Sequence, residues 1–318
     1  MSTKKDKFSK QDRYFMKIAI NLAKKQIGLT GTNPSVGCVI VKNNKIISYA
    51  ATNKNGRPHA ETLALNMNKR KNVGSTVYLT MEPCSHYGKT PPCTNALIKS
   101  KVKKVIYSIE DKDIRSFNKS KKILKSNKIL TKSGLLSIEV NNLYKKYNYI
   151  KKKKLPYSTG KLACSLNLYI QRNNINITNE HSRKVSHLLR YKNQGILTSY
   201  KTVNNDNPRL NCRISGLEKF SPIRIIIDRD LKINLKSFIV KDSLKNKTIV
   251  FHDSKKITKI NKLKNAGLKL VPFMVENDNY FDLKKLLKKI YELGIHTVLV
   301  ECGKDLTYKM ISGNLFNE

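Results

Sequence analysis

Four residues in the first third of the chain combine metal-binding chemistry with an acid–base group. His59 is followed two positions later by Glu61, and Cys84 and Cys93 come further on with eight residues between them. One imidazole and two thiolates give zinc three ligands and leave its fourth tetrahedral position open for water, as in catalytic zinc sites. Glu61 is close enough in sequence to take a proton from that water and later deliver it to a departing amine. The order of these groups is that of zinc deaminases, so the sequence predicts hydrolytic removal of an amine.

The same residues also have simpler interpretations. A histidine and a glutamate this close together often lie on an exposed helix, and paired cysteines often pack in a core. His86 lies between the two cysteines and offers a fourth ligand, which would turn the site into a closed structural one. The combined order of His59, Cys84 and Cys93, with a predicted strand between the first two, favours the catalytic interpretation.

Helices and strands predicted around the motif explain how these residues could meet. Apolar residues at helical spacing predict a helix over residues 13–27, and His59 and Cys93 each lie where a further helix should begin. A helix N-terminus lowers the pKa of a thiol, which favours the thiolate that binds metal. This alternation predicts an α/β fold in layers. Short apolar runs predict the strands, the first of them followed by a hairpin, at residues 36–41, 76–80 and 104–109.

A second series of elements follows a run of lysines. Residues 151–154 are four consecutive lysines and predict a solvated joint in the chain. We therefore divide the sequence into two domains, residues 1–150 and 151–318, as its length also suggests. Beyond the joint the pattern restarts with six predicted strands, at residues 161–167, 195–199, 223–228, 247–251, 268–273 and 297–302. Helical patterns are predicted at residues 181–192, 281–293 and 304–312.

The charge of the chain invites a nucleic-acid interpretation, because the 318 residues carry a formal net charge of +41. Of the 63 basic residues, however, 52 are lysine and only 11 are arginine, the side chain that phosphate and base recognition favours. The lysines are spread evenly over the two halves, and the chain also contains 33 asparagines. Since both residue types have A/T-rich codons, a drift in nucleotide composition explains the charge without a nucleic-acid ligand.

Other sequence features indicate where the protein works. There is no run of about 18 apolar residues, which argues against a transmembrane helix, and the N-terminus lacks the apolar stretch of a signal peptide. Six cysteines in a chain of this length do not resemble a disulfide framework. We therefore expect a cytoplasmic protein that uses cysteine for metal binding or packing.

Three sequence blocks resemble the deaminase domain of the bifunctional riboflavin-biosynthesis deaminase–reductases. The blocks are NPSVGCVIV at residues 33–41, PHAE at 58–61 and EPCSHYGKTPPCTNALI at 82–98. The insert between the two cysteines is specific to this branch of the deaminases. The resemblance implies a cytidine-deaminase-like three-layer α/β sandwich for the N-terminal half.

The resemblance also implies roles for individual residues. Glu61 would be the proton shuttle, and one zinc would be held by His59, Cys84 and Cys93. A pyrimidine carrying a phosphoribosyl group would contact three further residues, Asn33, Lys89 and Asp111. Lys89 has an independent rationale, because a flexible ammonium in a loop framed by glycine and proline can reach a phosphate, although it is also one lysine among many.

Two positions depart from the family pattern in this half. Thr52 stands where the family tends to carry histidine, and Asp113 stands where an asparagine would contact substrate. The groups assigned to the chemistry are all present. We therefore expect the deamination chemistry to be retained and the affinity for substrate to be altered.

The second half resembles the reductase domain of the same enzymes, which has a dihydrofolate-reductase-like α/β fold and uses NADPH. The block at residues 195–213 carries most of the resemblance, and weaker matches lie at residues 161–167, 182–190, 222–228 and 300–303. Substrate contacts are implied for four residues, Arg190, Leu210, Arg213 and Glu301. Cofactor contacts are implied for four others, Cys164, Thr202, Asp206 and Gly303. Gly303 would open a phosphate-binding turn at the start of a helix, where backbone N–H groups favour anions.

This half departs further from its family pattern. The family motif SLDG reads SLNL at residues 165–168, which loses an acid and a glycine, and the stretch at 173–178 is short. Asp305 places a negative charge in the turn expected to bind the cofactor phosphate. The sequence also stops at residue 318, where the resemblance implies further strands that complete the sheet and form a dimer contact. Arg190 and Arg213 could instead pair with carboxylates at the surface. The departures from the family pattern leave a deaminase with an inactive reductase half as an alternative.

The motif thus predicts a zinc-dependent deaminase, and the resemblance implies that it acts on 2,5-diamino-6-(5-phosphoribosylamino)pyrimidin-4-one and also reduces the ribosyl group to ribityl with NADPH. Two other classes stay open: a nucleic-acid or cytidine deaminase with the same zinc motif, and a zinc-stabilised remnant without activity. The long spacing between Cys84 and Cys93 and the reductase-like second half argue against the first. The expected partner is a small molecule, with neither nucleic acid nor membrane, and the resemblance admits a homo-oligomer.

Overall fold

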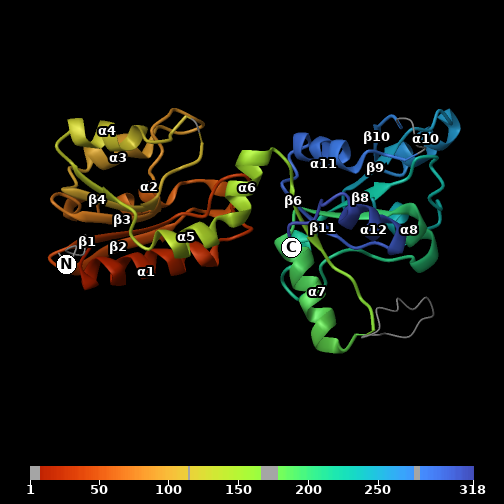
Figure 1. The fold of residues 1–318 in the computed structure, drawn as a ribbon, viewed down its shortest axis with the longest axis horizontal. Helices are drawn as coiled ribbons and strands as arrows, with labels where there is room; N and C mark the ends of the chain where they lie inside the picture. Colours follow the sequence, from red (N-terminus) through yellow and green to blue (C-terminus); the bar gives the residue numbers. More distant parts are fainter. Residues whose placement is uncertain (1–7, 114, 166–177, 276–279) are drawn as a thin grey trace. The chain divides into compact units, whose positions relative to one another are not determined.

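The computed structural model describes residues 8–113, 115–165, 178–275 and 280–318. The chain divides into two compact units, Met1–Lys153 and Lys154–Glu318, and each unit has its own sheet and hydrophobic core (Figure 1). Within the described ranges, no helix combines the length and the apolar character needed to cross a membrane.

The first unit is built on a mixed sheet of five strands in the order β2-β1-β3-β4-β5. In chain order the strands are β1 (Gly37–Lys42), β2 (Lys45–Ala51), β3 (Thr76–Met81), β4 (Lys104–Ile109) and β5 (Leu130–Ser133). β1 is antiparallel to β2 and β3, whereas β3, β4 and β5 are parallel to one another. Because β3 and β4 are parallel, the residues that follow them meet at one edge of the sheet.

Helices cover both faces of this sheet, with α1 and α5 on one face and α2, α3 and α4 on the other (Figure 1). Their bounds are α1 (Lys10–Lys25), α2 (Ala60–Met67), α3 (Cys93–Lys99), α4 (Lys119–Ser126), α5 (Ser137–Leu143) and α6 (Lys145–Lys153), with two short 3-10 helices at Lys54–Gly56 and Lys69–Lys71. α1 lies directly on β1 because Gly37 has no side chain, and a Cβ there would overlap the carbonyl group of Ala19. The result is a three-layer sandwich.

The second unit contains a six-stranded sheet in the order β10-β9-β8-β7-β11-β6, in which each neighbouring pair is parallel. The strands are β6 (Tyr157–Gly160), β7 (Gly195–Ser199), β8 (Ile223–Ile227), β9 (Thr248–His252), β10 (Lys269–Pro272) and β11 (Thr297–Val300). The helices are α7 (Glu180–Lys192), α8 (Tyr200–Asp206), α9 (Phe238–Lys241), α10 (Ile257–Asn265), α11 (Leu283–Glu292) and α12 (Lys304–Ser312), with a 3-10 turn at Glu218–Phe220.

Alternating strand residues divide the core of the second unit between the two faces of its sheet. Leu197 and Ile225 pack in one cluster with side chains of α11 and α12. Their neighbours Ile196 and Ile226 pack in another cluster with side chains of α8, α9 and α10. Because successive strand residues point to opposite faces, a sheet covered on both sides reads as a continuous apolar run, as in residues 225–227.

The last residues of the sequence lie along the outer edge of β6. The backbone N–H of Asn317 donates to the carbonyl of Ser158 at 2.9 Å, and the N–H of Gly160 donates to the carbonyl of Glu318 at 2.8 Å. These bonds satisfy part of the edge that would otherwise be open to another strand.

The strand predicted at residues 161–167 is wrong. The strand in this region is β6, which ends at Gly160 because its partner β11 ends at Val300, directly opposite. Residues 161–165 form no regular element, and residues 166–177 lie outside the described part of the chain. The lysine run spans the point at which the two units divide, between Lys153 and Lys154. Its first three residues, 151–153, form the last turn of α6, and Lys151 is partly buried. The other predicted elements are present, with ends shifted by a few residues.

Candidate active site

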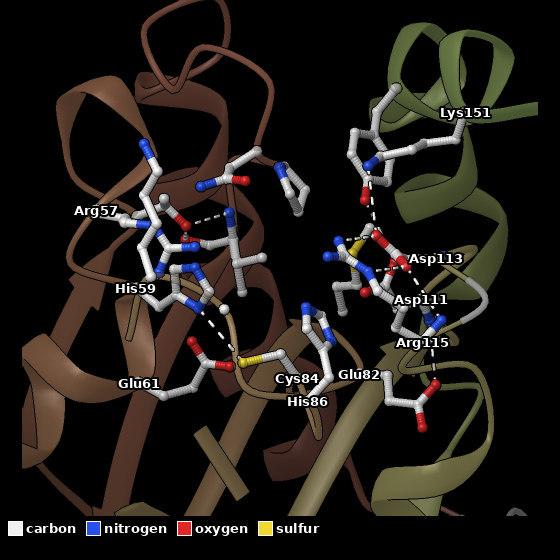
Figure 2. Close-up of a pocket in the computed structure, with 18 residues that line it drawn as sticks. Arg57, His59, Glu61, Glu82, Cys84, His86, Asp111, Asp113, Arg115 and Lys151 are labelled. Atoms are coloured by element: carbon white, nitrogen blue, oxygen red, sulfur yellow. Dashed lines mark hydrogen bonds and ion pairs between the residues drawn. The ribbon is translucent and has the colours of Figure 1, made fainter. Parts of the chain in front are cut away.

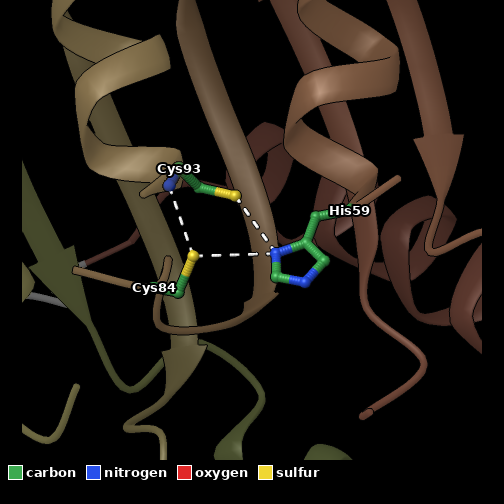
Figure 3. Close-up of side chains that lie close together, drawn as sticks. All are labelled: His59, Cys84 and Cys93. Carbon is green, nitrogen blue, oxygen red and sulfur yellow. Dashed lines mark hydrogen bonds between the residues drawn. The ribbon is translucent and has the colours of Figure 1, made fainter. Parts of the chain in front are cut away.

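His59, Cys84 and Cys93 converge in the first unit (Figure 3). Nδ1 of His59 lies 3.3 Å from Sγ of Cys93 and 3.6 Å from Sγ of Cys84. One ligand atom from each residue lies within 4.8 Å of the other two, so the imidazole and the thiols point toward a common centre. Zinc fits this donor set, because it takes thiolate and imidazole ligands in tetrahedral geometry.

Three chain segments position these ligands. As predicted, two of them lie at the start of helices: His59 is the N-cap residue of α2, and Cys93 is the first residue of α3. Cys84 lies in the loop after β3, and its sulfur accepts a hydrogen bond from the backbone N–H of Cys93 at 3.2 Å. The two helices pack against each other, so their starts face the end of β3 together.

Glu61 is the carboxylate beside this centre. It lies in the first turn of α2 and is only 3% exposed. Burial, and then the nearby sulfur of Cys84, raise the pKa of Glu61 to about 7. Hydrogen bonds from Cys93 and His59 outweigh burial at Cys84 and lower the pKa of that thiol to about 4. The site therefore combines a ready thiolate ligand with a carboxyl group that can gain and lose a proton near neutral pH.

The geometry favours three ligands over four. His86 does not join the cluster that the described residues form, and its Nδ1 instead lies 2.8 Å from the hydroxyl oxygen of Ser116. Three ligands leave a coordination position for water, as in catalytic zinc sites. When bound, zinc activates that water by lowering its pKa. Glu61 is the side chain beside the ligands that can accept the proton.

A pocket of about 320 Å³ adjoins the cluster, a volume suited to a small molecule. Its wall includes two of the three cluster residues, Glu61 and the residues predicted to contact substrate: His59, Cys84, Glu61, Asn33, Lys89 and Asp111. Figure 2 shows His59 and Glu61 on one side of the pocket and Asp111 and Asp113 on the other. The structure therefore brings the residues assigned to chemistry and those assigned to binding into one cavity.

Asn33 is fixed at the pocket wall by its own loop. Its side-chain nitrogen donates to the carbonyl of Gly56 at 2.9 Å, and the hydroxyl of Thr30 donates to the carbonyl of Asn33 at 2.7 Å. Gly56 has a φ of +82°, and a Cβ at this position would lie 2.5 Å from the side-chain nitrogen of Asn33. Glycine is therefore required here for both its conformation and the close approach.

Thr52, one of the two departures from the family pattern, also lines the pocket. Its hydroxyl oxygen accepts a hydrogen bond from the backbone N–H of Val36 at 2.9 Å, and the residue is 1% exposed. The side chain thus supports the segment that leads into β1. Because the hydroxyl of Thr52 is hydrogen-bonded to the backbone, the main effect on the pocket is that threonine is smaller than the histidine of the family pattern.

Glu82 is a pocket residue that the sequence analysis did not single out. Its carboxylate accepts hydrogen bonds from the backbone N–H groups of Asp111 and Asn118, both at 3.2 Å, and from the hydroxyl of Ser120 at 2.7 Å. Burial raises the pKa of Glu82, although these hydrogen bonds oppose the rise. Glu82 therefore holds the loop that carries Asp111. Its position directly before Pro83 and Cys84 is the sequence feature that could have predicted its place in the pocket.

Helix α6 supplies two more pocket residues, Tyr147 and Lys151. The hydroxyl of Tyr147 donates to the carboxylate of Asp111 at 3.3 Å. No spacing in the sequence connects these residues, because α6 follows the sheet and folds back to the pocket only in three dimensions. Arg57 and Arg115 also line the pocket and were not predicted either.

The four residues predicted to bind the reductase substrate lie in one neighbourhood of the second unit. Arg190, in the last turn of α7, donates to both carboxylate oxygens of Glu301 at 2.8 and 2.9 Å and to the carbonyl of Asn211 at 3.2 Å. Arg213 donates to the side-chain oxygen of the same Asn211 at 3.2 Å. Leu210 precedes Asn211 and is buried, with a φ of 50°. Arg190 thus pairs with a carboxylate, as the alternative interpretation expected, and the carboxylate is that of Glu301.

Cations outnumber the carboxylate in this neighbourhood, because Glu301 is faced by both Arg190 and Lys161. Burial raises the pKa of Glu301, but hydrogen bonds and charge from Arg190, together with Lys161 at 3.5 Å, more than offset burial and lower the pKa overall. Burial and the neighbouring Arg190 lower the pKa of Arg213. An exposed arginine near another cation is well placed to gain from an anionic ligand.

The predicted cofactor residues are less tightly gathered. Thr202 lies in the first turn of α8, and a Cβ on Gly303 would be 4.0 Å from its hydroxyl oxygen, so these two residues are neighbours. Gly303 is the N-cap residue of α12, as expected for a phosphate-binding turn. Asp206 is the exposed last residue of α8, and Cys164 is partly buried in the irregular segment after β6. The altered motif at residues 165–168 lies largely outside the described residues.

The negative charge of Asp305 is not isolated in that turn. Asp305 lies in the first turn of α12, and its carboxylate is 3.1 Å from Nζ of Lys201 on α8. Both side chains are well exposed, so the pair is easily rearranged. The turn therefore has a cation next to the acid that was expected to repel a phosphate.

Two family profiles match the chain, one in each unit. The profile of the cytidine and deoxycytidylate deaminase zinc-binding region matches residues 9–109. The profile of the RibD C-terminal domain matches residues 156–318.

Whole proteins and solved structures are similar across both units. The riboflavin biosynthesis protein RibD of Aquifex aeolicus is 36% identical over 296 residues, which cover 92% of this chain and 81% of that protein. RibD of Escherichia coli is 32% identical, and the alignment covers 97% of this chain and 86% of that protein. The structure of Acinetobacter baumannii RibD matches with a TM-score of 0.85 and 31% identity, and it covers 96% of this chain and 84% of that one. A Thermotoga maritima deaminase/reductase matches with a TM-score of 0.80 and 31% identity, covering 95% and 84%.

Proposed function

The chain belongs to the RibD family of riboflavin-biosynthesis enzymes, and on that premise we propose how its residues share the two reactions of the family. It is a zinc-dependent pyrimidine deaminase with an NADPH-using reductase domain. We assign deamination to residues 1–150 and reduction to residues 151–318, because each family profile falls within one of these ranges. The proposed first substrate is 2,5-diamino-6-(5-phosphoribosylamino)pyrimidin-4-one.

In the deaminase pocket, the ligands of zinc are His59, Cys84 and Cys93. Glu61 accepts a proton from water and delivers it to the ring amine as that amine leaves as ammonia. In this exchange one carbon–nitrogen bond breaks and one carbon–oxygen bond forms, so the ring gains a carbonyl group. The burial of Glu61 supports this role, because it places the pKa where the carboxyl group can act first as a base and then as an acid.

The remaining pocket residues orient the substrate. Asn33 and Asp111 are fixed by hydrogen bonds to the surrounding loops and face the pyrimidine. Lys89 reaches the phosphate from the loop between the two cysteine ligands. Binding through the non-reacting phosphoribosyl group helps to hold the ring in the geometry that the proton transfer requires.

In the second unit, NADPH supplies the hydride that converts the ribosyl group to ribityl. The substrate is held by Arg190, Leu210, Arg213 and Glu301. The cofactor is held by Cys164, Thr202, Asp206 and Gly303. The contacts that link Arg190 to Glu301, and both arginines to Asn211, support a common substrate site.

We further propose that the enzyme works in the cytoplasm on a small molecule rather than on nucleic acid. The six cysteines are free thiols in the structure, as expected for a reducing compartment. The pocket volume suits one phosphoribosyl-pyrimidine.

The observation that carries the proposed function is the convergence of the three zinc ligands beside buried Glu61, next to a pocket lined by Asn33, Lys89 and Asp111. The test is an assay of the purified, zinc-loaded chain with the diaminopyrimidine phosphate, in which ammonia release and NADPH oxidation are followed together. We expect ammonia first and NADPH oxidation only after deaminated product has formed. A folded, zinc-loaded sample that releases no ammonia would refute the deaminase assignment, and ammonia without NADPH oxidation would refute the reductase assignment.

A further inference from the structure

Asp113, the second departure from the family pattern, is held by two cations at the pocket wall. Its carboxylate accepts hydrogen bonds from the guanidinium of Arg115 at 2.9 and 2.6 Å, and Nζ of Lys151 lies 3.5 Å away. The Asp113 side chain is 11% exposed, whereas Lys151 is 31% exposed. Figure 2 shows Lys151 extending from α6 toward Asp113. All three residues, which we call the Asp113 cluster, line the deaminase pocket.

Asp113 differs from the other carboxylates in the same wall in the direction in which its pKa is shifted. Burial raises the pKa of each of the other three, Glu61, Glu82 and Asp111, which favours their neutral forms. The Arg115 guanidinium, in contrast, holds the pKa of Asp113 well below its usual range, even though burial opposes this. Among the described residues that line the pocket, Asp113 is thus the carboxylate whose charge the protein actively maintains.

A lone negative charge at this position would oppose the proposed substrate. The substrate carries a phosphate with a charge of about −1.5 to −2, and like charges in one low-dielectric pocket disfavour each other. Two cations around one carboxylate reverse the sign of the local charge. Arg115 and Lys151 both lie beyond residues 9–109, so the segment after the matched zinc-binding region provides this compensation.

We propose that Arg115 and Lys151 set the affinity of the deaminase pocket for its phosphorylated substrate by neutralising Asp113. The proposal rests on the proposed function, because it concerns the same pocket and the same substrate. Lys151 is the sharper probe of the two, since it is less exposed and α6 holds it over the ring of Tyr147, with Nζ 5.5 Å from the ring centre.

The test is a double-mutant cycle of Lys151→Met and Asp113→Asn. We expect Lys151→Met to raise KM for the phosphorylated pyrimidine by about three- to tenfold with little change in kcat, because Asp113 loses one of its two cations and then repels the phosphate. The effects of the two substitutions should not add, since adjacent charged residues are coupled. Asp113→Asn should remove most of this effect, so that the double variant has a KM close to that of Asp113→Asn alone. Added salt should shrink the effect of Lys151→Met, because screening weakens a charge repulsion.

The next residue on α6 provides the matched control. Lys152→Met makes the same change of charge on the same helix, but Lys152 is exposed and does not line the pocket, so KM should stay at its original value. The same pyrimidine without its phosphate serves as a second control, for which Lys151→Met should change KM little. Thermal unfolding of each variant checks that the fold is retained.

Two results would overturn the proposal. If Lys151→Met raised KM equally with and without the Asp113→Asn substitution, Lys151 would contact the phosphate directly. If it raised KM in neither case, the charge of Asp113 would not affect binding of the phosphorylated substrate. Equilibrium binding of the phosphorylated pyrimidine to the same variants, each combined with Glu61→Gln, reports affinity without turnover. Absence of ammonia release by the unaltered chain would therefore refute the proposed reaction while the binding cycle still decides the role of the cluster.

Discussion

The two units use their charged residues in different ways. In the first unit, His59, Cys84 and Glu61 line a cavity, and burial raises the pKa of Glu61 and of Glu82 beside them. In the second unit, Arg190 and Glu301 are nearly buried and are bound to each other through two hydrogen bonds. We therefore expect changes at the zinc ligands and Glu61 to affect mainly the chemistry of the first unit. In the second unit, loss of one partner leaves an uncompensated charge, so stability should be lost along with binding.

The strongest test of this contrast removes a zinc ligand. Cys84→Ser should abolish zinc binding and lower deamination by more than about a hundredfold, because even changes around a metal site cost ten- to a hundredfold. The second unit should continue to oxidise NADPH at the original rate when deaminated pyrimidine is supplied. Metal analysis and the two assays measure these outcomes. A parallel loss of both activities would show that the units do not act separately.

The next effect concerns stability in the second unit. Arg190→Ala should destabilise this unit by about 3–5 kcal/mol, since it leaves the carboxylate of Glu301 buried without its main partner. Lys184→Ala, on the same helix, breaks an exposed pair with Glu180 and should cost less than about 1 kcal/mol. Hydrogen exchange in β7 and β11 reports the local stability. Equal costs for the two variants would contradict the account of a buried pair.

A smaller effect is expected in the pocket of the first unit. Tyr147→Phe removes a donor to Asp111, and a hydrogen bond to the ionised form lowers the pKa of an acid. Its loss should raise the pKa of Asp111 further and move the acid limb of the kcat/KM profile to higher pH, by about 0.5 to 1 unit for a bond of ordinary strength. Tyr14→Phe, on α1 and away from the pocket, is the control. An unshifted acid limb would exclude Asp111 as an ionised contact.

The sequence predicted most of what the first unit needs for chemistry. Zinc restricts its ligands to a few side chains, so the spacing of His59, Cys84 and Cys93 was informative before any fold was known. Both helix starts were also correct, because the segments AETLALNM after His59 and CTNALIK from Cys93 read as helices.

The residues that complete the pocket were not predictable in the same way. Glu82 acts through backbone N–H groups of a distant loop, and Tyr147 reaches Asp111 only because α6 folds back. A similar limit explains the wrong strand at residues 161–167. Its apolar pattern was compatible with a strand, but strand length depends on the partner β11, which ends at Val300.

The charge was the least informative feature at the level of the whole chain. Only a few of the many cations line the pocket, among them Lys89, Arg57 and the two cations of the Asp113 cluster. Their partners in three dimensions, rather than their number, determine what they do.

The measurement that tests the central claim most directly is the activity of Glu61→Gln in one zinc-loaded sample with NADPH present. We predict that zinc stays bound, that ammonia release falls by about 10²- to 10⁴-fold, and that NADPH oxidation returns when deaminated pyrimidine is added. Ammonia release at the rate of the unaltered chain would contradict the assignment of Glu61 as the proton shuttle.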